Sequence, residues 1–493
     1  PLFSANGLSA QTSFVVGGNE TTGLDAVLAG VNDNWSFSLG GFHFETDGYR
    51  ENNDLDQDLA SALVHYRTTE DTSWLLEARL SRREQGDLAL YFDPTNYIPD
   101  LRQSEDTESL RLGVRHAVGQ RSLVLAQVSY QWADLGTVAG SFLSQSADAD
   151  GLSAELQFLH QGERWHLTTG VRYRDRETDA TTTTNIPIED PPFVFSATEI
   201  TTAESDLRSA YVYIDYDVTD DLQFTVGAAG EDLEGGLEDS RRIHPKVGVR
   251  WEATDSTVVR AGAFRALREF AYSRQDIALT LEPTQVAGFN QFFADTEGTE
   301  AWRYGLAVDQ RISDQLFAGA ELSKRDRDVP FLEAGGPPDF GFTVVTNSAE
   351  DTNGRTYLYW LPSDSFATAI SYQFDRQVRD LPGIPDNLLS VNTHRVPLEA
   401  RFFSPGGFGA RVAATWLHQS GRFLDAFFSE IDADESFWVW DLGLSYRLPG
   451  RSGLIGVEVR NLFDEDNRFQ DLDPQNPRIS PERLALLRAT LAF

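Results

Sequence analysis

The sequence predicts an all-β fold: a transmembrane antiparallel β-barrel of about 22 strands, with short periplasmic turns and long extracellular loops. Three observations predict it. Apolar and polar residues alternate with a period of two along most of the 493 residues, tight turns alternate with long polar connections, and the chain ends on an alternating strand at Phe493. No stretch reaches the ~18 consecutive apolar residues of a membrane helix, so a membrane-spanning form of this chain crosses as strands.

The alternation places apolar side chains on one face of each segment and charged side chains on the other. In WLLEARLS (residues 74–81), Trp74 and Leu76 lie opposite Glu77 and Arg79. The same arrangement recurs in LRLGVRHAV (110–118), AYVYIDYDV (210–218) and LIGVEVRNL (454–462). Such recurrence is typical of a barrel wall that meets hydrocarbon outside and water inside.

The connections follow the same scheme. Tight turns are expected at 32–34, 70–72, 118–121, 161–164, 219–221, 254–256, 313–315, 362–365, 404–407 and 449–453. Long polar loops are expected near 91–106, 177–203, 271–297 and 463–480. An even number of strands puts both termini on the short-turn side. No linker or composition break divides the chain, so we expect one outer-membrane barrel domain over residues 1–493.

Aromatic residues cluster at the short-turn ends of the predicted strands. They are Trp35, Trp74, Trp165, Phe224, Phe366 and Phe408, just after turns, and Tyr216 and Tyr446, near strand ends. We interpret them as an aromatic girdle at one membrane interface, where amphipathic rings prefer to lie. The alternative is that aromatic residues are simply common in strands.

Composition excludes several classes of function. With 41 basic and 76 acidic side chains the net charge is −35, so a nucleic-acid partner is not expected. The absence of cysteine excludes disulfides, thiolate metal sites and cysteine catalysis. The chain starts at Pro1 and has no methionine, so we expect that a segment precedes it, and a signal peptide is neither visible nor excluded.

The last strand offers a way to close the barrel. Phe493, Leu491 and Ala489 share one face of LALLRATLAF, the final ten residues. Pairing this strand with the first strand, near residues 7–18, leaves no open sheet edge in the membrane. A terminal aromatic after alternating apolar residues also resembles the C-terminal assembly signal of bacterial outer-membrane proteins.

The C-terminal region carries a family resemblance. Residues 454–493, with Asn461-Leu462-Phe463-Asp464 and the pair Pro477 and Arg478, resemble the end of a TonB-dependent receptor barrel. This resemblance implies an integral location in the outer membrane of a Gram-negative bacterium. It also implies a porin-like transport channel that is gated or plugged.

The resemblance breaks at the N-terminus, because those receptors carry an N-terminal plug and a short segment that pairs with TonB. Here the first strand is expected within ten residues of Pro1, so we expect the plug or periplasmic domain to be absent from this chain. Residues 35–67 and 86–94 resemble receptor-like barrels fused behind tetratricopeptide repeats. The expected partners are therefore outer-membrane lipid, a periplasmic scaffold or plug, and an extracellular partner at the long acidic loops.

Charged residues are expected on the lumen face because they lie opposite the apolar stripe. The predicted lumen-lining residues are Glu77, Arg79, Arg111, Arg115, Glu155, Arg172, Asp215, Arg250, Glu252, Arg303, Glu399, Arg401, Asp441, Glu458, Arg460 and Arg488. Two interpretations are open. The residues select a substrate or dock a plug, or they form cross-strand ion pairs that stiffen the wall.

No residue pattern indicates an enzyme or a cofactor. The acidic clusters Asp432, Asp434 and Glu435, and Asp464 to Asp466, offer oxygen ligands for Ca²⁺, but solvated loop charge is the better interpretation. The histidines show no metal-binding spacing, and no serine and histidine are placed as nucleophile and base. We therefore expect no catalytic site and no metal site.

Two classes of function remain. The first is an outer-membrane transport barrel of TonB-dependent-receptor type, gated or plugged by a missing or separate part. The second is an outer-membrane anchor whose long acidic loops hold a surface partner without transport. A conventional receptor whose plug precedes Pro1 is a variant of the first.

Overall fold

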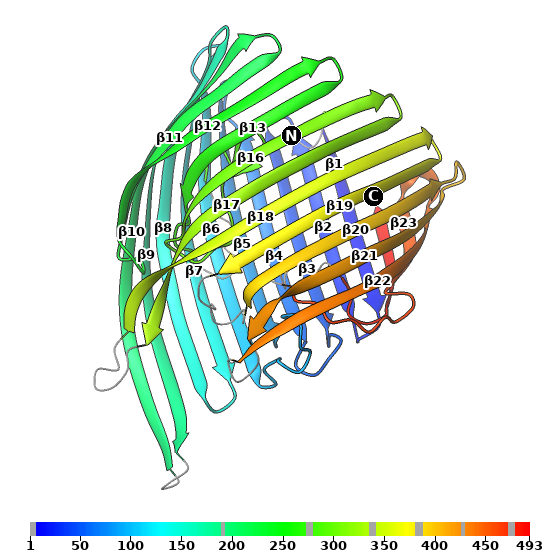
Figure 1. Ribbon diagram of the computed structural model, residues 1–493. Helices are drawn as coiled ribbons and strands as arrows, with labels where there is room; N and C mark the ends of the chain where they lie inside the picture. Colours follow the sequence, from blue (N-terminus) through cyan, green and yellow to red (C-terminus); the bar gives the residue numbers. More distant parts are fainter. Residues whose placement is uncertain are drawn as a thin grey trace.

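The computed structural model describes residues 6–188, 193–272, 280–334, 342–379, 388–424, 429–471 and 479–493. Twenty-two strands form one closed antiparallel sheet (Figure 1), which confirms the predicted fold class and strand number. Another pair of two-residue strands, β14 (Gln285–Val286) and β15 (Phe289–Asn290), forms a hairpin within one connection.

The first half of the barrel runs through β1 (Gly7–Gly17), β2 (Thr22–Asn32), β3 (Trp35–Thr46), β4 (Leu55–Arg67), β5 (Thr72–Gln85), β6 (Leu101–Ala117), β7 (Ser122–Ala139), β8 (Leu143–Gln161), β9 (Trp165–Ile188), β10 (Phe193–Thr219) and β11 (Leu222–Glu234). The second half runs through β12 (Ser240–Thr254), β13 (Thr257–Leu267), β16 (Glu300–Ser313), β17 (Leu316–Ala334), β18 (Phe342–Ser363), β19 (Phe366–Arg379), β20 (Leu388–Phe403), β21 (Phe408–Leu424), β22 (Glu430–Arg447), β23 (Gly453–Arg460) and β24 (Leu484–Ala492). The expected tight turns all lie between consecutive strands.

Closure occurs between the first and last strands, as predicted. β1 pairs with β24 from Gln11, opposite Ala492, to Gly17, opposite Leu486. Ala10 and Phe493 exchange two backbone hydrogen bonds of 3.0 and 2.8 Å. β1 begins and β24 ends at the short-turn end of the barrel (Figure 1). The terminal strand is therefore paired on both sides, and the barrel has no open seam there.

The two faces of the wall meet different surroundings. Large apolar side chains such as Leu76, Leu110 and Leu112 are about half exposed on the outer face, and they alternate with the charged residues of the inner face. This is the period-two pattern that a lipid-facing wall requires. Among the described residues, no helix is both long enough and apolar enough to cross a membrane.

The expected loop near 177–203 is wrong. β9 has 24 residues and β10 has 27, and the two strands pair continuously from Trp165, opposite Tyr216, to Ile188, opposite Phe193. They project beyond the neighbouring strands at the long-loop end (Figure 1). Spanning a bilayer requires only ~9–11 residues, so about half of each strand stands clear of the membrane. The run of threonines there favours strand rather than loop, because β-branched residues suit a pleated sheet.

The buried core lies inside the ring, where three connections fold against the inner wall. They are the β13–β16 connection (268–299), the β5–β6 connection (86–100) and the β23–β24 connection (461–483). We call the first of these the lumen loop; residues 273–279 of this loop and 472–478 of the β23–β24 connection lie outside the described part. Loops expected to extend into the medium therefore occupy part of the lumen.

Candidate functional site

The residues predicted to line the lumen all project from the inner face of the sheet. Some share that face with residues that contact the inward-folded connections, and the others alternate with apolar residues that point outward. Glu155 and Arg172, for example, are cross-strand partners beneath the lumen loop. That the set lines a solute pathway stays a prediction. The structure divides it into a buried group and an uncovered group.

The uncovered group lies toward the short turns and forms ion pairs along the wall. Arg111 pairs with Glu77, and Arg250 pairs with Glu252 at 2.7 Å. On β20 to β23, Glu399 contacts Arg401 and lies 2.8 Å from Arg411, while Glu458 lies 3.6 Å from Arg411 and 3.2 Å from Arg460. These side chains are 25–52 % exposed, so each pair adds little stability.

Three glycines give the lumen loop a seat on the wall. Gly248, Gly262 and Gly305 lie directly opposite one another on β12, β13 and β16. A Cβ at Gly305 would lie 2.4 Å from Phe289, and one at Gly248 would lie 2.8 Å from the Cβ of Ala287. A side chain at Gly248 or Gly305 would overlap the hairpin, and a Cβ at Gly262 would lie 3.2 Å from Phe289, so the hairpin would have to shift. The row of glycines is therefore a trough shaped to the β14–β15 hairpin.

Apolar contacts fill the rest of this seat. Val286 and Phe289 are buried against Tyr211, Tyr213 and Phe264, with Ala229 and Ala307 beside them. Fully burying a side chain of this size stabilises by about 1.5–3 kcal/mol relative to leaving it exposed. The hairpin is thus packed as a core element, although it lies inside a barrel.

Buried ion pairs hold the beginning of the lumen loop. Glu269 accepts hydrogen bonds from Arg172 and, at 2.8 Å, from Arg174, and all three side chains are at most 4 % exposed. Burial alone would raise the pKa of the Glu269 carboxyl, but the two guanidinium groups outweigh burial and hold that pKa below its usual range. Farther along, Arg176 pairs with Glu297 at 2.8 Å. Charge thus fixes the loop where it leaves and re-enters the wall.

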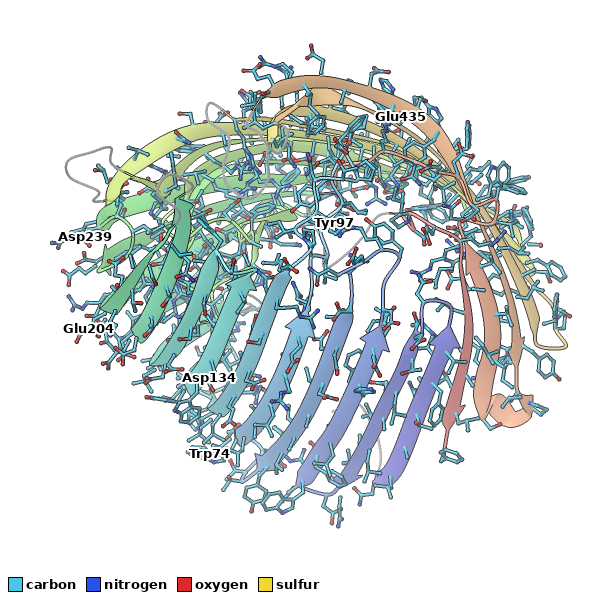
Figure 2. The ribbon with its side chains drawn as sticks, turned by 90° about the horizontal axis from the view of Figure 1, so that it is seen from below. Trp74, Tyr97, Asp134, Glu204, Asp239 and Glu435 are labelled. Atoms are coloured by element: carbon cyan, nitrogen blue, oxygen red, sulfur yellow. The ribbon has the colours of Figure 1, made fainter. Side chains whose placement is uncertain are left out.

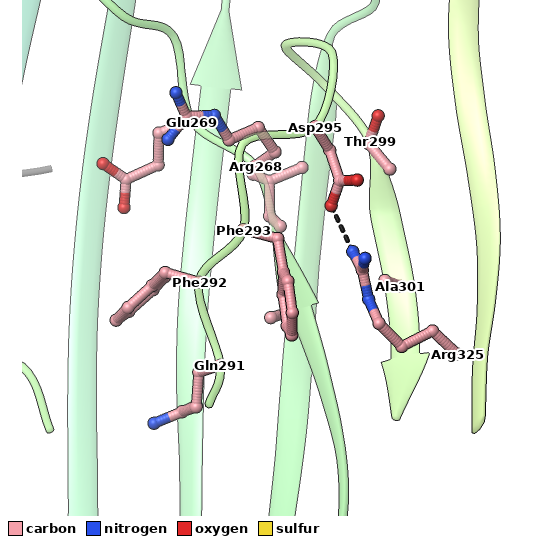
Figure 3. A pocket seen from close by; sticks show the side chains of 11 residues that line it. Arg268, Glu269, Gln291, Phe292, Phe293, Asp295, Thr299, Ala301 and Arg325 are labelled. Carbon is pink, nitrogen blue, oxygen red and sulfur yellow. Dashed lines mark hydrogen bonds and ion pairs between the residues drawn. The ribbon is translucent and has the colours of Figure 1, made fainter. Parts of the chain in front are cut away.

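A second ion cluster holds the loop near its end (Figure 3). Asp295 pairs with Arg325 and lies 3.0 Å from Arg327, and both arginines also pair with Asp351 on β18. The Arg325 guanidinium stacks 3.7 Å from the ring centre of Phe293. The cavity beside this cluster has a volume of about 20 Å³, which suits a single water molecule. It is too small to be a binding site for a larger solute.

Hydrogen bonds to the wall fix the middle of the loop. The Leu281 amide donates to Glu155 at 2.8 Å, and Thr280 donates to the same carboxylate at 3.2 Å. Lys246 donates to Gln291 and lies 3.7 Å from Glu282, which also accepts a hydrogen bond from Tyr213. Buried polar groups of this kind are stable only while their partners stay in place.

The β5–β6 and β23–β24 connections contact each other inside the ring. Phe92 stacks on Phe423 of β21 with 5.2 Å between ring centres, and Leu90 pairs with Asp471 through an isolated backbone bridge. Because β5 and β21 lie on opposite sides of the β24–β1 closure, the β5–β6 connection reaches over several strands. Figure 2 shows Tyr97 of this connection inside the ring of strands.

Asn461, the first residue of the predicted C-terminal motif, organises the last connection. It is fully buried, with φ +45°, and its side-chain amide bonds the carbonyls of Glu465, Ser480 and Pro481. Asp464 accepts a hydrogen bond of 2.8 Å from the Arg483 amide at the start of β24. The motif therefore joins the ends of the last long connection. Pro477 and Arg478 lie outside the described residues.

The aromatic residues predicted at the membrane interface project outward near the short turns. Trp35 stacks on Tyr66 with 4.1 Å between ring centres, and Trp165 lies beside Tyr216 in the register. A second outward group, about midway along β19 to β22, was missed by the sequence analysis. Its members are Tyr372, His394, Trp416, His418, Trp438 and Trp440.

The expected acidic cluster at Asp432, Asp434 and Glu435 is not in a loop, because these residues belong to β22. Adjacent strand residues point to opposite faces, so Asp434 and Glu435 do not converge on one ion. Among the described residues, His43, Asp56 and Asp58 bring their ligand atoms within 4.8 Å of one another, but His43 and Asp58 already bond each other at 2.9 Å.

Sequence reasoning missed the buried group around the lumen loop, apart from Glu155, Arg172 and Arg303. A signal for the wall side was present, since Arg172, Arg174 and Arg176 recur at every second residue, as do Arg325 and Arg327. Nothing in the sequence paired Arg172 and Arg174 with an acid 97 and 95 residues away, or Arg325 and Arg327 with acids 24–32 residues away. The glycine trough also appears only once the strand register is known.

Comparison with known proteins agrees with this architecture. Residues 5–462 match the family model described as "TonB dependent receptor-like, beta-barrel". No curated relative matches the sequence. The solved structures that resemble the chain include the copper transporter OprC, with 16 % identity, a TM-score of 0.73, and coverage of 100 % of this chain and 81 % of that one.

Two other similar structures are an iron transporter and a pyoverdine receptor. The FrpB iron transporter from Neisseria meningitidis has 10 % identity, a TM-score of 0.74, and coverage of 100 % of this chain and 82 % of that one. The pyoverdine receptor FpvA from Pseudomonas aeruginosa has 12 % identity, a TM-score of 0.74, and coverage of 99 % and 79 %. At such identities these likenesses show the fold alone. The family match goes further: the chain is an integral β-barrel of the bacterial outer membrane and belongs to the TonB-dependent receptor-like barrel family, a family of transport proteins and not of enzymes.

Proposed function

We propose that this barrel carries a solute across the outer membrane and that passage is controlled at two levels. The inward-folded connections obstruct the extracellular half of the lumen. A plug-like part, upstream in the same protein or separate, binds the charged wall near the short turns. The observation that carries this proposal is the contrast between the two halves of the inner wall.

The extracellular half is already occupied. The lumen loop has a shaped glycine trough, an apolar core and buried ion pairs, which together specify one resting position. A loop that only touched the wall through exposed polar contacts would have no such seat. An obstruction of this kind suits a wide barrel, since an open 22-stranded lumen would leak small solutes.

The half near the short turns offers an uncovered charged surface. Arg401, Arg460 and Arg250 are 44–52 % exposed and alternate with carboxylates on the same wall. Charges of both signs arranged on a concave wall suit a partner with complementary charges. We therefore place the binding surface of the plug-like part here, and a periplasmic helical scaffold is one form that part can take.

The cargo is inferred only by exclusion. The named cargoes of the similar structures include copper, iron and pyoverdine, all stated for those proteins. This sequence contains neither cysteine nor methionine, so it supplies no thiolate or thioether for Cu(I), which prefers soft sulfur ligands. A solute recognised through oxygen and nitrogen groups fits the chain better.

Reconstitution in planar lipid bilayers tests the proposal. The purified chain should conduct ions, and a variant whose lumen loop is released should conduct more. A barrel that stays silent in both forms contradicts transport and favours the second candidate, an anchor that displays its long strands to an extracellular partner. The projecting β9–β10 ribbon is the observation that favours that alternative.

A further inference from the structure

The first part of β10 is paired with β9 but not with β11. Its pairing with β11 stops at Asp206, opposite Glu234, while its pairing with β9 continues to Phe193. The stop is fixed locally, since the Ser205 hydroxyl donates to the Gly235 carbonyl at 2.9 Å. Among the described residues, residues 196–203 pair only with β9, so the other edge of this segment has no strand partner in the described part of the chain; we call it the free edge.

The residues along this free edge are exposed to solvent. Every residue from 196 to 204 is exposed, and Ile200 is 78 % exposed. Eight residues at ~3.3 Å each give an edge of about 26 Å, on which every second residue turns a backbone N–H and C=O outward. That length is ample for strand addition.

The edge lacks most features that prevent strand pairing. Residues 196–204 read SATEITTAE, without proline or lysine, and the β9–β10 register runs without a shift. Natural sheets usually protect such an edge with a bulge, a proline or inward-pointing charges. Here only Glu199 and Glu204 add charge, and both are acidic.

The acidic groups surround the edge on both faces. Glu204 lies directly opposite Glu177 of β9, and Asp179, two positions along, accepts a hydrogen bond from Thr202. Glu199 lies on the other face, because odd and even positions alternate. Like charges directly opposite each other are unfavourable, so a cation placed between Glu204 and Glu177 would relieve repulsion.

We propose that the free edge of β10, residues 196–203, binds a basic extended segment of an extracellular protein by strand addition. Backbone hydrogen bonds supply the affinity, and the acidic residues on both faces select lysine or arginine at successive positions of the added strand. A second copy of this chain is a poorer partner, because its β10 would bring the same carboxylates to the contact. This surface is independent of the lumen and of the transport function.

A direct test uses two synthetic ten-residue peptides, one alternating lysine with threonine or valine, the other with glutamate in place of lysine. Binding to the barrel in nanodiscs is followed by fluorescence anisotropy, and the site is located by hydrogen exchange. We expect the basic peptide to bind and to protect residues 196–203, and the acidic peptide not to bind. Protection elsewhere, such as in the lumen, would overturn the proposal.

Charge reversal supplies the matched control. The double variant Glu199→Lys with Glu204→Lys should weaken binding of the basic peptide by about tenfold or more, because each reversal replaces an attraction by a repulsion. The double variant Glu70→Lys with Glu163→Lys makes the same change in net charge at exposed short turns on the opposite end of the barrel and should leave binding unchanged. Equal weakening by both variants would reduce the effect to net charge and refute a local site.

Proline substitution separates strand addition from simple charge attraction. Thr201 and Thr202 turn their amides in opposite directions, so one of Thr201→Pro and Thr202→Pro removes an edge-facing donor. That variant should lose peptide binding while the thermal unfolding of the barrel stays unchanged. If both variants bind the peptide as the unmodified chain does, backbone pairing is not the mode of recognition.

Discussion

Removing the carboxylate of Glu269 should release the lumen loop. Arg172 and Arg174 have exposed side-chain fractions of 1 % and 4 %, so Glu269→Ala leaves two guanidinium groups buried beside each other without their shared carboxylate. Breaking a buried pair by removing one partner costs about 3–5 kcal/mol. At 1.4 kcal/mol for each factor of ten, the open population of the loop should rise by roughly two to three and a half orders of magnitude.

The assay is hydrogen exchange of residues 281–291. The Leu281 amide donates to Glu155 and the Gln291 amide donates to Thr284, so both should exchange faster once the loop opens. Glu297→Ala is the matched control, since it removes the same charge from the same loop where Arg176 and Glu297 are 15 % and 19 % exposed. Its effect should be clearly smaller than that of Glu269→Ala, because solvent reaches this pair and partly compensates for the lost carboxylate. Equal effects from the two variants, or no effect from Glu269→Ala, would refute the buried ion pair as the loop's attachment.

Three further outcomes follow from the same structure. Gly305→Leu should displace Phe289 and raise hydrogen exchange in the β14–β15 hairpin. Barrel assembly should be unaltered, as judged by the difference in gel mobility between unheated and heated samples. Because the pKa of Glu269 is lowered, its stabilisation of the lumen loop is complete above the ordinary carboxyl pKa of about 4.3 and is lost as the pH falls through the lower folded-state value. Hydrogen exchange of the lumen loop should therefore stay constant from neutral pH down to about pH 5 and rise only in stronger acid. Leu112→Arg on the outer face should cost about 2–4 kcal/mol of stability if it lies near the membrane midplane, measured by urea unfolding in lipid vesicles, whereas Ser81→Arg on the inner face should cost less.

The wall was predictable because the membrane imposes one simple constraint on every strand. Each spanning segment must alternate between hydrocarbon and water, so segments such as 74–81 carry their own assignment without reference to the rest of the chain. The tight turns predicted where consecutive strands join, and the strand that ends at Phe493 predicted where the barrel closes. Nothing comparable constrains a strand above the membrane, so the ribbon near 177–203 was mistaken for a loop.

The lumen contents were not predictable for a different reason. The contact between Arg172 and Glu269 joins residues nearly a hundred positions apart, and the same acid is equally compatible with a solvated loop. The trough of Gly248, Gly262 and Gly305 is spread over three strands and becomes a single feature only in register. Local periodicity therefore predicts the barrel wall, while the arrangement of the connections inside the lumen depends on tertiary pairing.

The central claim is that the lumen loop obstructs the barrel, and a disulfide tether tests it most directly because the chain has no native cysteine. Gly248→Cys with Ala287→Cys, placed in the Glu269→Ala background, joins the hairpin to its trough. The two Cβ atoms would lie 2.8 Å apart and a disulfide needs about 3.5–4.5 Å, so the hairpin lifts by about 1 Å when the bond forms. Single-channel conductance should be low in the oxidised protein and should rise when a reductant frees the loop. Conductance that is the same in the oxidised and reduced states would contradict the account.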